Sequence, residues 1–296
     1  MNTEPGWDLY RSFLAVLEER SLSGAARRLG LTQPTLARHL DALEQAIGTQ
    51  LFLRSQRGLS PTDTALELAP YARALAANAA ALLRTASSAA GEVRGAVRIS
   101  ASEVVGAEHL PPVLAALRTQ HPRLVVELVL SNAVENVLER EADIAVRMIA
   151  PVQEALLARH LPPLRLGLHA HARYIARKGV PATLEDLPGH DLIGYDRETP
   201  AIRAVLGRFP MLERAGYALR TDSDLAQLAA IRAGFGIGIC QVAIARRDPA
   251  LVPVLPDAFT LDLPVWIVMH EDLKASARHR VVFDALVEAM RAVAQL

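Results

Sequence analysis

Several common sequence features are missing from this chain, and each absence removes a class of function. Cys240 is the single cysteine, which excludes an internal disulfide and a cysteine-rich zinc site. No run of about 18 uncharged apolar residues is present to span a bilayer. Residues 1–8 lack the basic and apolar segments of a secretory signal. We therefore expect a cytoplasmic protein without membrane contact.

Motifs of the common enzyme classes are also absent. The chain has no Gly-x-Ser-x-Gly elbow, no Walker loop and no His-Glu-x-x-His motif. His169 and His171 would share a face only on a strand, and no cysteine or carboxylate stands beside them in the sequence. Cys240 follows an apolar run, which favours a small core residue over a redox sensor. We expect no enzymatic activity, no metal and no cofactor.

The charge of the chain is balanced as a whole but not locally. Lys+Arg and Asp+Glu both number 32, so the net charge does not point to nucleic acid. Residues 20–60 carry six arginines against two acids, a formal charge of +4. A charge run is usually a solvated face, so this local excess needs a structural motif beside it.

A pattern of three short helices overlaps the basic region. Apolar residues from Leu9 recur at helical spacing, and Ser23 stands at the predicted N-cap of a second helix. Gly30 then offers a turn, and Thr32 followed by Pro34 is typical of the start of a third helix. A helix, a tight turn and a capped second helix place the start of a recognition helix in the DNA major groove.

The third helix is predicted to have one apolar and one polar side. Its apolar positions are Leu36, Leu40, Leu43 and Ile47. The residues on or near the opposite side are Gln33, Thr35, Arg38 and His39. Glutamine can pair with an adenine edge, and arginine with guanine or phosphate. We therefore expect Gln33, Thr35 and Arg38 to contact DNA.

Two short strands after Gly48, at residues 50–54 and 58–61, predict a wing. Its Arg54 and Arg57 would lie near the phosphate backbone, where they position a protein without reading sequence. The predicted DNA-binding residues are Ser23, Thr32, Gln33, Pro34, Thr35, Arg38, Arg54 and Arg57. On spacing alone, two packed helices of an all-α subdomain with solvated arginines are the alternative.

An alanine-rich segment follows the predicted wing. Residues 65–90 hold 12 alanines in 26 positions, which predicts one long helix with a narrow, close-packing surface, kinked early by Pro70. The serines and glycines of residues 87–95 favour a helical linker and hinge, with a helix buried in its own domain as the alternative.

The remaining residues alternate between strands and helices. The pattern predicts strands at 96–101, 124–130 and 143–147 and helices at 110–120 and 134–140, a rhythm that favours a parallel sheet with helices on its faces. Further predicted elements are strands at 164–169, 191–194, 217–221, 236–240 and 263–269 and a helix at 276–294.

Polar residues follow several of these strands. Ligands of open α/β sheets bind beyond the carboxyl ends of the strands, and hydroxyl groups there can hold a small anion or polar metabolite. The candidate effector-binding residues are Ser102, Ser131, Asn132, Arg147 and Thr221. For each serine, threonine or asparagine, helix capping is the alternative role.

One long run carries a family resemblance. Residues 23–40 read Ser-Gly-Ala-Ala-Arg-Arg-Leu-Gly-Leu-Thr-Gln-Pro-Thr-Leu-Ala-Arg-His-Leu, and residues 9–62 as a whole resemble the DNA-binding domain of LysR-type transcriptional regulators without a gap. Ala37 stands where this family often has serine. Ala65 stands where it usually has glycine, so we expect Thr62 or Asp63 to cap the following helix.

Residues 98–102, 143–147 and 233–238 resemble, in order and spacing, the LysR-type effector-binding domain, a two-lobed α/β fold like periplasmic solute-binding proteins. The resemblance implies a regulator that binds a double-stranded DNA operator and responds to a small-molecule effector between the lobes. It implies a homodimer or homotetramer, with RNA polymerase as a further partner.

The implied domains are a winged helix-turn-helix (residues 1–62), a linker or dimerisation helix (63–92) and an effector-binding domain (93–296). Within the last, lobe I comprises residues 93–162 and 260–296, and lobe II residues 163–259. A solute-binding-like sensor or an enzyme without a DNA-binding role is the rival hypothesis, which leaves residues 23–57 unexplained.

Overall fold

The structure is a computed structural model that describes residues 4–55, 58–86, 93–132, 142–151, 156–199, 202–203, 207 and 209–296. The described residues form two compact units, an N-terminal unit up to residue 86 and a C-terminal unit from residue 93. Each unit has its own hydrophobic core. The helix predicted at residues 134–140 lies outside the described residues.

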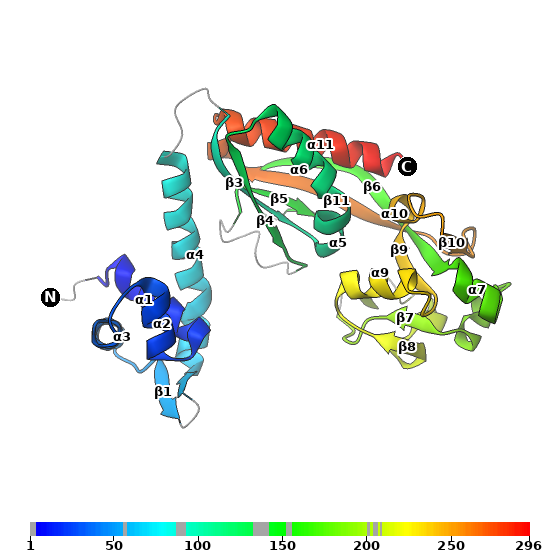
Figure 1. Cartoon of the computed structure of the whole chain (residues 1–296). Helices are drawn as coiled ribbons and strands as arrows, with labels where there is room; N and C mark the ends of the chain where they lie inside the picture. The colour runs from blue at the N-terminus through cyan, green and yellow to red at the C-terminus, as the bar shows by residue number, and fades with distance from the viewer. Residues whose placement is uncertain are drawn as a thin grey trace. The chain divides into compact units, whose positions relative to one another are not determined.

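Three helices open the N-terminal unit in the predicted order (Figure 1). They are α1 (Trp7–Glu19), α2 (Leu22–Leu29) and α3 (Gln33–Ile47). The hydroxyl of Thr32 caps α3 by accepting a hydrogen bond from the Thr35 N–H at 3.3 Å. Gly48 ends α3 at φ 81°, a left-handed conformation that favours glycine.

The start of α2 differs from the prediction. Its N-cap is Ser21, whose Oγ accepts a hydrogen bond from the Gly24 N–H at 3.0 Å, whereas Ser23 lies exposed within the helix. The preceding residue, Arg20, adopts a left-handed conformation at φ 51° and ends α1. Because the turn is this short, the helix restarts at Leu22, and the first of the two serines becomes the cap.

A hairpin and a long helix complete the N-terminal unit. The hairpin consists of β1 (Phe52–Ser55) and β2 (Gly58–Pro61), which pair antiparallel. Helix α4 (Asp63–Ala86) contains Pro70 near its start, and Thr62 caps it. The Thr62 Oγ1 accepts a hydrogen bond from the Ala65 N–H at 3.2 Å, which confirms one of the two expected caps.

The core of the N-terminal unit joins these elements. Leu36, Leu40 and Leu43 of α3 are buried against α1, together with apolar residues of α2 and α4. The rings of Phe13 in α1 and Phe52 in β1 lie 5.7 Å apart, which connects the hairpin to the helices. The predicted apolar stripe of α3 is therefore its buried face.

A seven-stranded sheet organises the C-terminal unit. Its strands are β3 (Gly95–Ala101), β4 (Leu124–Leu130), β5 (Ile144–Arg147), β6 (Leu156–His171), β9 (Gly238–Gln241), β10 (Leu251–Val254) and β11 (Leu261–His270). The order is β10-β6-β11-β5-β3-β4, with β9 also paired to β6. Strand β3 is parallel to β4 and β5, as predicted.

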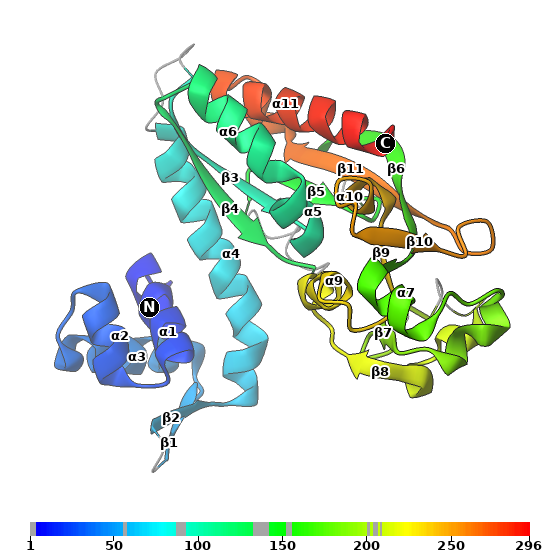
Figure 2. The ribbon, with the colours of Figure 1, turned by 45° about the vertical axis from the view of Figure 1, so that its right-hand side comes forward.

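The sheet as a whole is mixed rather than parallel. Strand β11 is antiparallel to both β5 and β6, and β6 is antiparallel to β9 and β10. The long strands β6 and β11 run in opposite directions because the chain leaves the first lobe along β6 and returns along β11 (Figure 2).

Two lobes share these long strands. Lobe I contains β3, β4, β5 and the helices α5 (Glu103–Glu108), α6 (Leu110–Gln120) and α11 (Ala277–Ala294). Lobe II contains α7 (Ala172–Lys178), β7 (Leu192–Gly194), β8 (Tyr217–Arg220), α9 (Asp224–Arg232), β9, α10 (Val242–Ala245) and β10. Helices α6 and α11 lie side by side over the sheet of lobe I, and lobe II has separate apolar clusters.

Candidate functional site

The N-terminal unit presents a polar helix face. Gln33 and Arg38 of α3 are exposed and Thr35 is half-buried. Within the described residues, no carboxylate pairs with Arg38, whereas Arg28 of α2 forms ion pairs with Glu18 and Glu19. Among the described residues, none therefore occupies the N–H donors of the exposed Arg38 guanidinium.

Other residues of the predicted DNA-binding set have local structural contacts. The hydroxyls of Thr32 and Thr35 lie 2.8 Å apart, and Pro34 occupies the first turn of α3. His39, expected near the polar side, instead has Nδ1 2.8 Å from Ser12 Oγ. The Ser12 hydroxyl donates to the carbonyl of Asp8, so its oxygen accepts from His39 and ties α3 to α1.

The hairpin supplies the predicted wing. Arg54 pairs with Leu59 in the strand register, one step from the end of β1. Arg57 lies outside the described residues. The helix pair α2–α3 with its turn at Gly30, followed by this hairpin, has the arrangement of a winged helix-turn-helix.

The C-terminal unit contains a cavity of about 260 Å³ between its lobes. Four of the five predicted effector-binding residues line it, namely Ser102, Ser131, Asn132 and Arg147. The fifth, Thr221, does not line it, but its carbonyl accepts a hydrogen bond from Gln227 Nε2 at 2.9 Å. Because Gln227 lines the cavity, Thr221 holds a lining residue in place.

Arg147 is the cation of this cavity. Its side chain is 6% exposed and donates to Ser100 Oγ at 2.6 Å and to the Val146 carbonyl at 3.2 Å. Burial lowers the pKa of Arg147, yet a guanidinium stays charged at neutral pH. In the described part of the chain, no carboxylate forms an ion pair with it and no acceptor meets its Nε.

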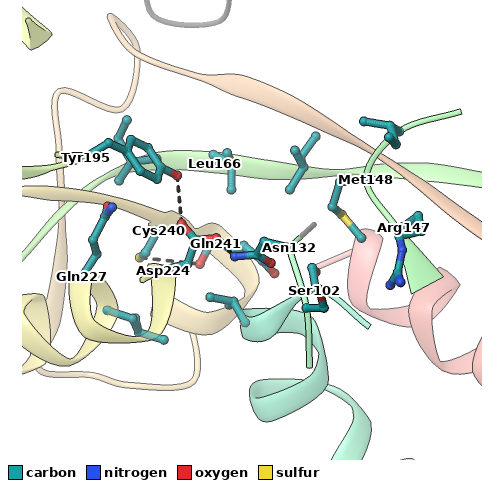
Figure 3. Close-up of a pocket in the computed structure, with 16 residues that line it drawn as sticks. Ser102, Asn132, Arg147, Met148, Leu166, Tyr195, Asp224, Gln227, Cys240 and Gln241 are labelled. Atoms are coloured by element: carbon teal, nitrogen blue, oxygen red, sulfur yellow. Dashed lines mark hydrogen bonds between the residues drawn. The ribbon is translucent and has the colours of Figure 1, made fainter. Parts of the chain in front are cut away.

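Asp224 at the start of α9 is the acidic group of the cavity. Its Oδ1 accepts a hydrogen bond from the Tyr195 hydroxyl at 2.9 Å, and its Oδ2 accepts one from Asn132 Nδ2 at 2.8 Å (Figure 3). Burial raises the pKa of Asp224, and the nearby Glu103 carboxylate adds to this effect. The two hydrogen bonds act in the opposite direction by favouring the ionised form.

Several bonds join the two lobes beside the cavity. Arg232 of α9 holds both carboxylate oxygens of Glu108 in α5, at 2.7 and 2.8 Å. His109 Nε2 lies 2.6 Å from Gln241 Oε1, and both side chains are buried. The Asn132–Asp224 bond also crosses between the lobes, so the cavity walls are fixed by polar contacts from both sides.

Four polar lining residues were missed by the sequence analysis: Tyr195, Asp224, Gln227 and Gln241. The strand-end rule that selected Ser102 also points to Tyr195, directly after β7, and to Gln241, the last residue of β9. Asp224 and Gln227 lie on α9, and that helix was not predicted.

Comparisons with known families agree with both units. Residues 7–66 match the family described as bacterial regulatory helix-turn-helix protein, lysR family. Residues 90–291 match the family described as LysR substrate binding domain. The chain belongs to the LysR family. It is a LysR-type DNA-binding transcriptional regulator with an effector-binding domain, and the predicted family is confirmed.

Full-length LysR-type relatives share this organisation. The transcriptional regulator CrgA of Neisseria meningitidis serogroup C is 28% identical over 290 residues, which cover 94% of this chain and 95% of CrgA. A probable hydrogen peroxide-inducible genes activator of Mycobacterium avium is 34% identical over 230 residues, which cover 75% of this chain and 67% of the relative. The first is described as a transcriptional regulator and the second as a probable activator of genes.

Solved structures of LysR-type regulators have the same fold. The structure of CrgA from Neisseria meningitidis aligns with a TM-score of 0.58 at 26% identity, over 95% of this chain and 97% of CrgA. CbnR, solved in complex with its target DNA, aligns with a TM-score of 0.65 at 20% identity, over 97% of this chain and 99% of CbnR. The predicted combination of a helix-turn-helix domain and an α/β regulatory domain is thus confirmed.

Two further observations on this LysR-type chain concern the reactivity of its cysteine and the residues that could span a membrane or bind a metal. Burial raises the pKa of the Cys240 thiol to about 12, so it stays protonated at neutral pH, the less nucleophilic form. Among the described residues, no helix is long and apolar enough to cross a membrane, and no three His, Cys, Asp or Glu side chains gather as metal ligands.

Proposed function

We propose that α3 and the wing of this regulator bind an operator, and that an effector in the inter-lobe cavity modulates that binding. The exposed face of α3 carries the first half of the proposal. Gln33 and Arg38 are exposed on α3, and its buried leucines anchor the helix in the core. A helix so held can enter the major groove without losing its packing.

Operator binding is testable in a band-shift titration of the full-length chain with intergenic DNA from beside its own gene. Arg38→Ala should weaken binding by about 1–3 kcal/mol, because the guanidinium loses a base or phosphate contact. Raising the salt concentration should weaken wild-type binding steeply, because binding releases counterions from the DNA and this release is less favourable at high salt.

The matched control for Arg38→Ala is Arg280→Ala, which removes an exposed arginine from the C-terminal unit. It should leave the affinity unchanged. Equal affinity of Arg38→Ala and the wild type, with both folded, would contradict the role of α3.

We infer a homo-oligomer, either a dimer or a tetramer of paired dimers. Helix α4 exposes large apolar side chains, and their exposure to water is unfavourable in a monomer. They are Leu66 (54% exposed), Tyr71 (73%), Leu75 (45%) and Leu82 (72%). A second copy of the same helix would cover them. Sedimentation of Leu82→Glu should reveal a smaller species than the wild type, and an unchanged mass would contradict pairing through α4.

The remaining parts of the proposal follow from regulation at an operator. We infer that the protein acts in the cytoplasm, where the operator and RNA polymerase are, and that RNA polymerase is a further partner. We also infer that the only small molecule it needs is the non-covalent effector, and that it catalyses no reaction. In vitro transcription with purified polymerase and the operator tests the partnership with RNA polymerase.

A further inference from the structure

We propose that the effector of this regulator is a small amino carboxylate, with its carboxylate on Arg147 and its ammonium group on Asp224. This inference rests on the proposed function of the cavity as the effector site. It adds the chemical class of the ligand, which follows from two opposite charges in one small cavity. Figure 3 shows Arg147 and Asp224 apart along the cavity, with Ser102 and Asn132 between them.

Among the described residues, no anion lies at the Arg147 end of the cavity. A buried charge is costly unless another charge or a set of hydrogen bonds compensates it. Here the described residues supply two acceptors, Ser100 Oγ and the Val146 carbonyl, for the five N–H donors of a guanidinium. Neither acceptor is charged. A ligand carboxylate would supply the missing negative charge and accept the unused donors, which suit it geometrically.

Ser102 adds a neutral hydrogen-bond donor between Asp224 and Arg147. Its side chain is half-buried and lines the cavity, and no described residue bonds to its hydroxyl. The same hydroxyl was predicted to bind an effector because it follows β3. It can donate to a ligand carboxylate oxygen without breaking any contact of the protein.

The Asp224 end is negative and held in place. Tyr195 and Asn132 fix its two carboxylate oxygens, and each oxygen keeps a further lone pair. Glu103, which accepts a hydrogen bond from Ser223, adds a second carboxylate close enough to favour protonation of Asp224. A ligand ammonium group would relieve this repulsion, whereas a second ligand carboxylate would increase it.

The size and middle of the cavity limit the ligand further. A volume of about 260 Å³ lies just below the range of drug-sized sites, so a molecule of few carbons fits. Val104, Leu166, Ile239 and Leu263 contribute apolar side chains to the wall. A short methylene chain between the two charged groups matches this lining.

The probes are straight-chain ω-amino carboxylates from glycine to 6-aminohexanoate, so that chain length measures the spacing of the two charges. Each is compared with the ω-amino amide, which lacks the carboxylate, and the ω-hydroxy carboxylate, which lacks the ammonium group. Thermal unfolding of the full-length protein is the readout. At least one amino carboxylate should raise Tm by about 5 °C at about 100 times its Kd, while its amide has no effect.

Two variants test which ligand group binds at Arg147 and which binds at Asp224. Arg147→Met should abolish the Tm shift and leave the Tm of the free protein equal or higher, because an uncompensated buried charge is removed. Asp224→Asn should weaken the amino carboxylate at least tenfold and leave the hydroxy carboxylate within about threefold. A lower Tm of free Arg147→Met would identify Arg147 as a structural cation and overturn the proposal. Arg147→Lys keeps the positive charge at this position and therefore separates loss of charge from loss of fold.

The outcomes separate this inference from the proposed function. A series without any Tm shift, or amides or hydroxy carboxylates that bind as well as the amino carboxylates, overturns the ligand class. The operator band shift of the same preparation is scored independently. Loss of the band shift alone overturns the regulator proposal and leaves the ligand assignment standing.

Discussion

The α3 residues predicted to contact DNA, Gln33, Thr35 and Arg38, lie within a few positions of one another, and Gln33 and Arg38 are exposed. The inter-lobe cavity, by contrast, collects polar side chains from Ser102 to Gln241, and most of them are wholly or partly buried. In the first unit a small apolar core supports an exposed polar face. In the second, the polar groups themselves form part of the interior.

This difference predicts different couplings between function and stability. An exposed side chain such as Arg38 can be removed with little effect on folding, because solvent replaces its contacts. His109 is buried and Asp224 half-buried; both form hydrogen bonds between the lobes, and Asp224 also lines the cavity. The chain has one tryptophan in each unit, Trp7 and Trp266, so the two can be followed separately by fluorescence.

The largest expected effect in this comparison is on the core of the N-terminal unit. Leu36 is fully buried on the inner side of α3. Leu36→Ala should lower the free energy of unfolding of this unit by about 2–5 kcal/mol, because the truncation leaves a cavity. Urea denaturation in a Trp266→Phe background measures it through Trp7.

The same substitution should leave the C-terminal unit unaffected. Its denaturation midpoint, followed through Trp266 in a Trp7→Phe background, should equal that of the parent. A matching loss in both units would contradict the separation of their cores.

A pH dependence is expected in the C-terminal unit. Burial lowers the pKa of His109 below its ordinary value of 6.5, and it does the same for His169. Between the ordinary and the lowered pKa, the unfolded chain binds protons that the folded chain does not. The stability is therefore full above about pH 6.5 and falls as the pH drops, by at most about 1.4 kcal/mol per pH unit for each histidine.

Urea denaturation between pH 7.5 and 5.5 measures this loss through Trp266 in the Trp7→Phe background. Glu108, whose pKa is lowered from 4.5, loses its contribution only below about pH 4.5, and Asp224, whose pKa is raised, adds stability as the pH falls, so neither is the source of a loss that begins at pH 6.5. His109→Gln removes one of the two contributing groups, so its slope should be smaller. An unchanged slope would exclude His109 as a contributor.

The two units also differ in how far their sequences predict them. Caps and apolar spacing are local signals, and they located α3 between Thr32 and Gly48. The N-cap of α2 was misplaced by two residues because the left-handed turn at Arg20, which decides between Ser21 and Ser23, has no sequence signal of its own.

Long-range geometry explains most of what was missed in the C-terminal unit. Helix α6 and strand β4 have the predicted bounds. Strand β6 begins eight residues earlier than predicted, and Pro162 and Pro163 inside it hide the strand pattern. Asp224 enters the cavity because lobe II faces lobe I there, which depends on how the antiparallel strands β6 and β11 bring the lobes together.

A smaller effect on stability distinguishes the helix cap Thr32 from the proposed DNA contact Arg38. Thr32→Ala should lower the free energy of unfolding of the N-terminal unit by about 1 kcal/mol, since α3 loses its N-cap hydrogen bond. Arg38→Ala should change it by less than about 0.5 kcal/mol. Equal stability losses from the two substitutions, measured through Trp7, would show that the exposed face of α3 is also structural.

The smallest expected effect concerns Ala65, where the resembling family usually has glycine. The residue is buried in the first turn of α4, its N–H donates to Thr62, and its φ is not positive. Glycine therefore brings no conformational advantage here and adds unfolded-state entropy. Ala65→Gly should cost about 0.5–1 kcal/mol in urea denaturation followed through Trp7. A gain in stability would instead mean that the turn after the wing prefers a glycine conformation despite its threonine cap.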